Sequence, residues 1–340
     1  GLELDPAEQK RTLERLGFEP SGSSVTVPTW RARDVTREAD LVEEVARFHL
    51  PEVPFTVAHG GAALLTRDQR LRRVVEDVLA GAGCSEAYTS SLVPEDPAPD
   101  AIRLPVPLSA EQAILRTTLL HGLVESARRN VDAGNESIAL FEIARVYLPS
   151  GEPRPDEHWH LGVIAEGGFF GAKGILETLY GALHVELRPE PAERKFLHPG
   201  KAARVDAGWL GELHPTLLDG HWGVFELDLE SLFAAVPERL VYEDVITYPA
   251  VRQDLAFVVG EDVLAGDLVD GAREAAGPEL REMRVFDVYR GGQIPEGKKS
   301  IAFSLAFQSP ERTLSDEDAR ELRERIVGAL AERFGAELRA

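Results

Sequence analysis

Hydrophobic residues recur along the chain with two different periods, and the change of period divides it into helices and strands. Spacing of three to four residues predicts helices over residues 6–16, 38–48, 66–82, 117–130, 174–183, 264–276 and 315–334. Alternation and short apolar runs predict strands over residues 24–27, 138–147, 161–165, 203–207, 224–229, 255–259, 283–289 and 300–307. Because helices and strands are interleaved, the pattern indicates an α/β and α+β protein.

The pattern is clearest near the carboxyl end of the chain. In the predicted strand 300–307, large apolar residues alternate with serine and alanine, so one face of the sheet is apolar and the other is built from small residues. Ser315, followed by three acidic residues, is typical of a helix N-cap. With a short final strand over 337–339, the order strand, helix, strand, strand, helix, strand predicts a ferredoxin-like domain.

Breaks in these patterns predict three domains. Residues 1–57 form a small α/β module, residues 58–243 form a core with a mixed sheet, and residues 244–340 form the ferredoxin-like domain. At 340 residues with 44% hydrophobic residues, the chain is long enough to bury more than one core.

Composition and charge exclude several classes of protein. No apolar run approaches the roughly 20 residues that span a bilayer, so we expect a cytoplasmic protein without a membrane partner. A single cysteine, Cys84, excludes an intrachain disulfide and a cysteine-rich zinc site. The net charge of −21 argues against non-specific coating of nucleic acid, although residues 284–312 carry a local excess of basic side chains.

An acidic cluster is the first candidate site. Asp40, Glu43 and Glu44 are spaced to share one helix face, and Asp34 precedes that helix. Oxygen-only ligands suit Mg²⁺, and a second subunit or water would complete its coordination. Acids near a helix N-terminus are also favoured by the helix dipole alone, so the pattern leaves both interpretations open.

Nucleophilic and phosphate-binding chemistry has little support. Cys84 is more simply a buried structural residue, and the histidines follow no metal-binding spacing. The glycine-rich segment 167–174 lacks the spacing of a phosphate-binding loop and is interpreted as a turn into the predicted helix 174–183. We therefore predict no catalytic residues.

Several separated stretches nevertheless carry a family resemblance. In the last domain, the sequences YPAVRQDLA, FDVYR, IPEGKKS and FQSPERTLSD (residues 248–256, 286–290, 294–300 and 307–316) resemble the ferredoxin-fold anticodon-binding domain of bacterial phenylalanyl-tRNA synthetase beta subunits. Upstream, ILRTTLL, LFEI, LHPG and LGELHP (residues 114–120, 140–143, 197–200 and 210–215) resemble the synthetase-like core of that subunit. Residues 30–47 resemble the small B5-like module before it.

The resemblance implies a fold and a role. The core would be a class II synthetase-like, mostly antiparallel sheet without the arginine-bearing catalytic motifs, so the chain would be inactive alone. It would act in an alpha2beta2 heterotetramer with a catalytic alpha subunit that uses ATP to attach phenylalanine to tRNA(Phe). The family's oligonucleotide-fold and editing domains have no counterpart in these residues.

The resemblance also implies site residues. Asp34, Asp40, Glu43 and Glu44 would hold Mg²⁺ shared with the alpha subunit. Five residues would contact RNA, because basic side chains beside an aromatic ring can follow a phosphate backbone and stack a base: Arg252, Tyr289, Arg290, Lys298 and Lys299.

Other interpretations stay open. Lysines at a hairpin can serve solubility alone. The alternative functions are a free-standing RNA-binding scaffold and a self-sufficient ligase that uses the core domain.

Overall fold

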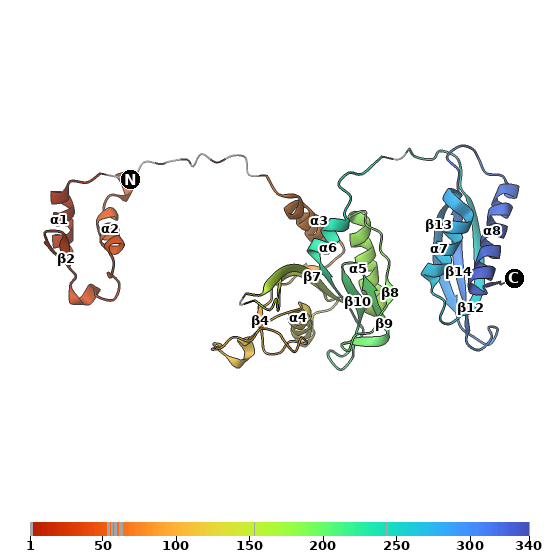
Figure 1. Cartoon of the computed structure of the whole chain (residues 1–340), viewed down its shortest axis with the longest axis horizontal. Coiled ribbons are helices and arrows are strands. Elements are labelled where there is room, and N and C mark those ends of the chain that lie inside the picture. The colour runs from red at the N-terminus through yellow and green to blue at the C-terminus, as the bar shows by residue number, and fades with distance from the viewer. Residues whose placement is uncertain are drawn as a thin grey trace. The chain divides into compact units, whose positions relative to one another are not determined.

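The computed structural model of the chain describes residues 3–52, 55, 57, 60, 64–152, 154–242 and 244–339. It divides into two compact units, residues 1–237 and 238–340 (Figure 1). The first contains a front module (residues 3–52) and a core domain (residues 64–237); the second is the C-terminal domain. The predicted boundaries at 57/58 and 243/244 involve residues outside this description, and the division into three domains stays a prediction.

The front module consists of two helices and a hairpin. Helix α1 (Pro6–Arg15) and helix α2 (Glu38–Ala46) flank the antiparallel strands β1 (Glu19–Ser21) and β2 (Ser24–Thr26). Asp5 caps α1 by accepting a hydrogen bond from the Ala7 backbone N–H. Four buried residues form the module's small core: Leu13, Phe18, Val35 and Val45.

A seven-stranded sheet organises the core domain. Its order is β3-β6-β7-β11-β10-β9-β8, and all pairs are antiparallel except β3 with β6. The mixed, mostly antiparallel sheet agrees with the fold class predicted from sequence. The strands are β3 (Ser85–Glu86), β6 (Ala139–Leu148), β7 (Asp156–Glu166), β8 (Glu190–Pro191), β9 (Leu197–Val205), β10 (Gly208–Leu213) and β11 (Trp222–Asp228). A separate pair, β4 (Leu92–Val93) and β5 (Ile114–Leu115), lies in the loop-rich segment before the next helix.

Helices cover both faces of this sheet. One core cluster joins alternate residues of β6 and β7 to α3 (Arg67–Gly81), α5 (Gly168–Ala182) and α6 (Leu229–Ala235). The cluster on the opposite face joins the other residues of the same strands to α4 (Leu120–Asp132). Strand and helix approach closely at Gly162, where an added Cβ would lie 2.7 Å from Leu123 Cδ1. Helix α4 therefore occupies the sheet face opposite α3 and α5.

The start of α5 differs from the sequence prediction. The glycine-rich segment that was interpreted as a turn is already helical, because α5 begins at Gly168 rather than Gly174. Gly167 and Gly168 have positive φ values of 95° and 62°, which favour glycine. The composition of residues 167–174 thus suggests a loop, but in the structure these residues begin a helix.

The C-terminal domain has the predicted ferredoxin-like order. Its elements are β12 (Val251–Gly260), α7 (Ala265–Ala276), β13 (Leu280–Tyr289), β14 (Lys298–Phe307), α8 (Asp316–Phe334) and β15 (Glu337–Leu338). The sheet order is β13-β14-β12-β15, and all pairs are antiparallel. Both helices pack against the large apolar residues of β12 and β14, in one core that includes Phe257 and Phe303. Ser315 caps α8 as predicted.

None of the helices in the described residues is long and apolar enough to cross a membrane.

Candidate nucleic-acid interface and subunit-contact groove

The sheet face opposite α7 and α8, here called the open face, is built from rows of facing residues. Strand register aligns β13, β14 and β12 so that each row carries a residue from every strand. The middle residue of each row is serine or alanine, so the floor of the face is low and the larger side chains stand at its edges. From one end to the other the rows are Glu282–Ala306–Arg252, Arg284–Ser304–Asp254, Asp287–Ala302–Ala256 and Tyr289–Ser300–Val258.

An aromatic and a basic side chain meet at one end of the open face. Tyr289 is 37% exposed, and the Arg339 guanidinium carbon lies 5.2 Å from the centre of its ring. Arg339 also donates to Gln293 Oε1 at 3.0 Å. A Cβ at Gly291 would lie 2.4 Å from the Tyr289 hydroxyl, so only glycine fits there without movement. Sequence reasoning missed Arg339 because its position over Tyr289 depends on the pairing of β15 with β12.

The five predicted RNA contacts differ in exposure and in the partners that they contact. Arg252 is exposed on the open face, with its guanidinium 3.6 Å from Glu282. Lys298 pairs with Glu337 at 2.6 Å. Arg290 instead forms hydrogen bonds with the Glu261 carboxylate, which raise the pKa of Arg290 above its ordinary value. All five assignments remain predictions.

Lys299 departs most from the expectation of a surface contact. Register places it opposite Val259, on the side of the sheet that faces the core, and only 8% of the residue is exposed. Its ammonium donates to the Glu261 carbonyl at 2.7 Å. In this structure the Lys299 ammonium is buried and already hydrogen-bonded, so it is not accessible to a phosphate group.

The acidic cluster of the front module is occupied by internal partners. Arg31 lies between two of its members, donating to Asp34 Oδ2 at 2.8 Å and to Glu44 Oε1 at 2.6 Å. Asp40 accepts hydrogen bonds from the backbone N–H groups of Thr36 and Arg37, both at 2.8 Å. Glu43 is exposed.

These contacts decide whether the cluster fits Mg²⁺. The hydrogen bonds from Arg31 hold the pKa of Asp34 and of Glu44 below their ordinary values, and backbone N–H groups lower the pKa of Asp40. Within the described part of the chain, no three histidine, cysteine, aspartate or glutamate side chains are grouped to hold a metal ion. In this arrangement Arg31 supplies the positive charge beside Asp34 and Glu44, and the magnesium site stays a prediction.

Two buried carboxylates in the core domain also have internal partners. Glu142 is 1% exposed and receives hydrogen bonds from Arg116 at 3.0 Å and from the Thr89 hydroxyl at 2.6 Å. Glu226 is 4% exposed and contacts Thr118 and His160. These groups hold the segment before α4 against the sheet, which is a structural role. Cys84 is buried as expected, and burial raises the pKa of its thiol.

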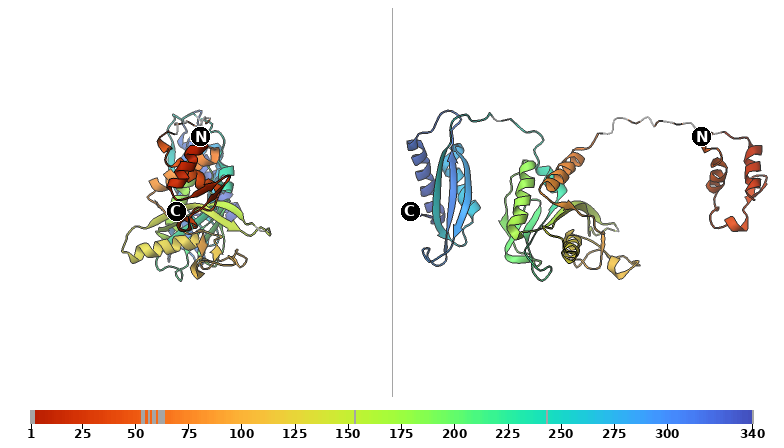
Figure 2. Two further views of the ribbon diagram at one scale, coloured as in Figure 1. Left: turned by 90° about the vertical axis from the view of Figure 1, so that its left-hand side faces the viewer. Right: turned by 180° about the vertical axis from the view of Figure 1, so that it is seen from behind.

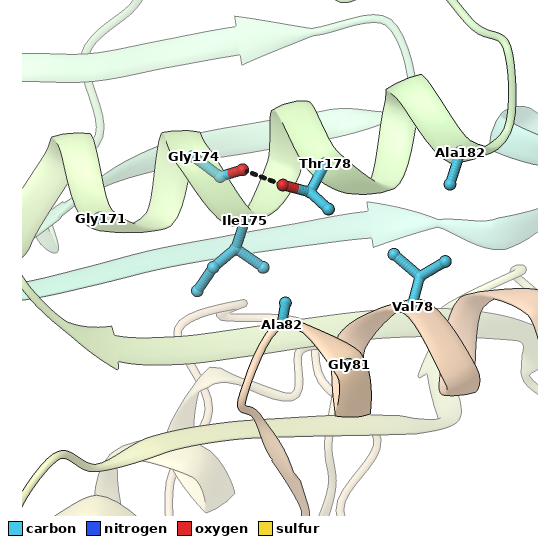
Figure 3. Close-up of a pocket in the computed structure, with 8 residues that line it drawn as sticks. All are labelled: Val78, Gly81, Ala82, Gly171, Gly174, Ile175, Thr178 and Ala182. Carbon is cyan, nitrogen blue, oxygen red and sulfur yellow. Dashed lines mark hydrogen bonds between the residues drawn. The ribbon is translucent and has the colours of Figure 1, made fainter.

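A groove of about 510 Å³ lies between α3 and α5 on the surface of the core domain. The two helices are in contact, and they lie close together in Figure 1 and in the right-hand view of Figure 2. Small or apolar residues of α3, its C-cap and α5 line the groove (Figure 3): Val78, Gly81, Ala82, Gly171, Gly174, Ile175, Thr178 and Ala182. A Cβ at Gly174 would meet no atom within 4 Å, so this wall is open rather than packed.

Three family models match the chain in sequence. The tRNA synthetase B5 domain matches residues 1–49, the phenylalanyl tRNA synthetase beta chain CLM domain matches residues 51–229, and the ferredoxin-fold anticodon binding domain matches residues 247–339. A solved pyrrolysyl-tRNA synthetase of Desulfitobacterium hafniense covers 71% of this chain and 96% of its own, at 17% identity and a TM-score of 0.38.

Curated relatives match along the whole chain. Phenylalanine–tRNA ligase beta subunits of Geobacillus kaustophilus and Moorella thermoacetica are each 38% identical to it, and that of Bacillus subtilis is 37% identical. Each alignment covers 100% of this chain and 47% of the relative, so the chain spans about half the length of these proteins. With the beta-chain model matching more than half of its residues, the chain belongs to the phenylalanyl-tRNA synthetase beta chain family.

Proposed function

We propose that this chain is the tRNA-binding and subunit-contact part of a cytoplasmic phenylalanine–tRNA ligase. An alpha subunit, in an alpha2beta2 assembly, would use ATP to attach phenylalanine to tRNA(Phe). The observation that carries the proposal is the open face, which lies in the domain that matches the anticodon-binding family. The names of the relatives support the reaction and the alpha-subunit partner.

The open face has features that suit single-stranded RNA. Ala302 and Ser304 leave the middle of its floor partly exposed, whereas Ser300 and Ala306 are buried, and Tyr289 offers a ring for stacking. Arg252 and Arg284 are largely exposed at its other end, where they share the Glu282 carboxylate at 3.6 Å and 2.8 Å. Because one carboxylate serves two guanidinium groups, a positive charge is left there to pair with phosphate. The unpaired anticodon loop of a tRNA is a substrate of this kind, since its bases are free to leave the stack.

Replacing Tyr289 with alanine should weaken binding of a tRNA(Phe) transcript about tenfold, because stacking on one aromatic ring contributes about 1–3 kcal/mol per base. Binding would be measured by fluorescence anisotropy at one fixed salt concentration. Tyr88→Ala, which removes a 96% exposed aromatic residue from the core domain, is the matched control and should leave the affinity unchanged. Equal losses in the two variants would remove the open face as the RNA site.

The groove between α3 and α5 is our candidate contact for the alpha subunit. Two helices that meet along a groove lined by glycine, alanine and valine can accept a further helix closely. The role of the core domain would then be to pack against the alpha subunit. On its other sheet face, α4 packs closely against the sheet at Gly162.

Gly174→Leu should abolish co-purification of the chain with its alpha subunit. The new side chain projects into open space in the groove, so the fold should persist, and the loss of a helical glycine should slightly raise the thermal midpoint. Gly266→Leu, in α7 of the C-terminal domain, is the control, because Gly266 is exposed, has no atom within 4 Å of an added Cβ, and does not line the groove. Binding of the alpha subunit by the Gly174 variant would contradict the proposed contact.

Co-purification of the wild-type chain with its alpha subunit also separates the alternative functions. A free-standing RNA-binding scaffold would bind tRNA but form no complex with an alpha subunit. A self-sufficient ligase would catalyse phenylalanine-dependent exchange of pyrophosphate into ATP without any partner. Complex formation together with no exchange by the isolated chain is the result that we expect.

A further inference from the structure

Two predicted RNA contacts, Arg290 and Lys299, turn toward a single acidic residue. Glu261 follows the end of β12 and lies beside the loop of residues 290–297 that joins β13 to β14. Its carboxylate accepts hydrogen bonds from Arg290 Nε at 2.9 Å and Arg290 Nη2 at 3.1 Å. Its carbonyl accepts from Lys299 Nζ at 2.7 Å. Its backbone N–H donates to the Gly297 carbonyl at 3.1 Å.

These contacts hold both ends of the loop. Arg290 is the first loop residue after β13, whereas Gly297 and Lys299 lie where the chain enters β14. The two-point geometry of the arginine–carboxylate pair fixes direction as well as distance. Glu261, the residue that follows β12, therefore constrains both ends of the β13–β14 loop.

The loop in turn touches the aromatic end of the open face. Gln293 accepts a hydrogen bond from Arg339, whose guanidinium lies over the Tyr289 ring. Gly291 passes close to the Tyr289 hydroxyl. A shift of the loop would therefore move the groups that surround the ring.

We propose that Glu261 is a positioning residue for the RNA interface, and that Arg290 and Lys299 act as its partners in a clamp on the loop rather than as phosphate contacts. This inference rests on the proposed RNA-binding function of the open face. The clamp keeps Gln293, Arg339 and Tyr289 in their relative positions before RNA arrives. Less conformational entropy is therefore lost from the loop when RNA binds.

The clamp and a phosphate contact predict opposite effects for Glu261→Gln. If Arg290 binds phosphate, removing the carboxylate frees a cation and reduces repulsion, so RNA binds more tightly. If Arg290 is part of a clamp, the loop loosens and RNA binds more weakly. The sign of the change separates the two roles.

The experiment measures affinity of the full chain for a tRNA(Phe) transcript across a series of salt concentrations. For Glu261→Gln we expect binding weakened about two- to fivefold, a modest loss because the ion pair is partly exposed, with an unchanged slope of log affinity against log salt. Glu274→Gln is the matched control. It removes the same charge and also breaks an arginine pair, with Arg333 of α8, but this pair joins the two helices away from the loop.

A swapped pair provides the rescue. The double variant Glu261→Arg with Arg290→Glu should restore affinity to within about twofold of the wild type, because the exposed pair is re-formed with its charges exchanged. A protein that needed Arg290 for phosphate would not be rescued. For Arg290→Gln, a salt slope reduced by about 0.7–0.9, the signature of one lost phosphate contact, would overturn the proposal. Tighter binding by Glu261→Gln than by Glu274→Gln would overturn it as well.

A second measurement needs no RNA. Trypsin cleaves after Arg290, at the end of the loop that the Glu261 carboxylate holds. This bond should be cut about two- to fivefold faster in Glu261→Gln than in the wild type or in Glu274→Gln. Equal cleavage rates would overturn the clamp. If the wild-type chain bound no tRNA while the cleavage rates differed as expected, the proposed function would fail and the clamp would stand.

Discussion

Replacing Arg116 with methionine should lower the free energy of unfolding of the core domain by about 3–5 kcal/mol, the cost of leaving a buried carboxylate without its counter-ion. Glu142 is 1% exposed and Arg116 is 3% exposed, so water cannot take the place of the guanidinium. Arg116 also donates to the Arg145 carbonyl at 3.1 Å and to the Thr89 hydroxyl at 2.9 Å. Loss of the side chain therefore leaves several buried acceptors without a donor.

Urea unfolding followed by tryptophan fluorescence would measure the loss, since Trp159, Trp209 and Trp222 all lie in the core domain. Arg145→Met is the matched control, because Arg145 pairs with Glu157 at the surface, and its loss should cost about 1 kcal/mol or less. The double variant Arg116→Met with Glu142→Leu should recover much of the stability by removing the stranded charge. Similar losses for Arg116→Met and Arg145→Met would contradict the argument.

The sequence predicted best where one periodic signal decides the structure. In β14 the large apolar residues all face one way, so alternation alone predicts the strand and its buried face. In β10 five of six residues are buried, among them Glu212, so no alternation exists to be recognised and this strand was not predicted. Glycines at the start of α5 suggest a loop, and only tertiary contacts explain why the helix begins there.

The candidate sites show a similar limit, because a sequence displays charges without their partners. The acids of α2 were correctly placed on one helix, but Arg31, which neutralises two of the cluster's carboxylates, precedes Glu44 by 13 residues. Lys299 and its acceptor Glu261 are 38 residues apart and meet only because β12 pairs with β14. Composition located the basic segment, and the fold decides which of its cations remain exposed.

The start of α5 depends on one buried carboxylate, that of Glu212. Lys201 Nζ donates to both of its oxygens at 2.9 Å, and the Phe169 backbone N–H donates to Oε2 at 3.2 Å. His221 lies 3.0 Å from Oε1. Burial alone raises the pKa of Glu212, but the hydrogen bonds from His221, Lys201 and Phe169 outweigh it and lower the pKa to about 2, from an ordinary value of 4.5.

This shift predicts a stability that depends on pH. Because the folded-state pKa of Glu212 lies below its unfolded value, the contribution is fully present above pH 4.5 and is lost as the pH falls toward 2. At neutral pH, Glu212→Gln should lower the free energy of unfolding by about 3 kcal/mol, the equivalent of the shift in pKa. The difference between wild type and variant should shrink steadily in urea titrations between pH 5 and pH 2.

A second acidic residue tests whether that pH dependence belongs to Glu212. Glu177 pairs with Lys173 on the exposed side of α5, and its side chain is 54% exposed. Glu177→Gln should cost less than about 1 kcal/mol at any pH, because an exposed pair is screened by solvent. If the difference between wild type and Glu212→Gln stayed constant down to pH 2, the carboxylate would have no special ionisation in the folded state. The start of α5, and with it the Gly171 and Gly174 wall of the groove, would then depend on packing alone.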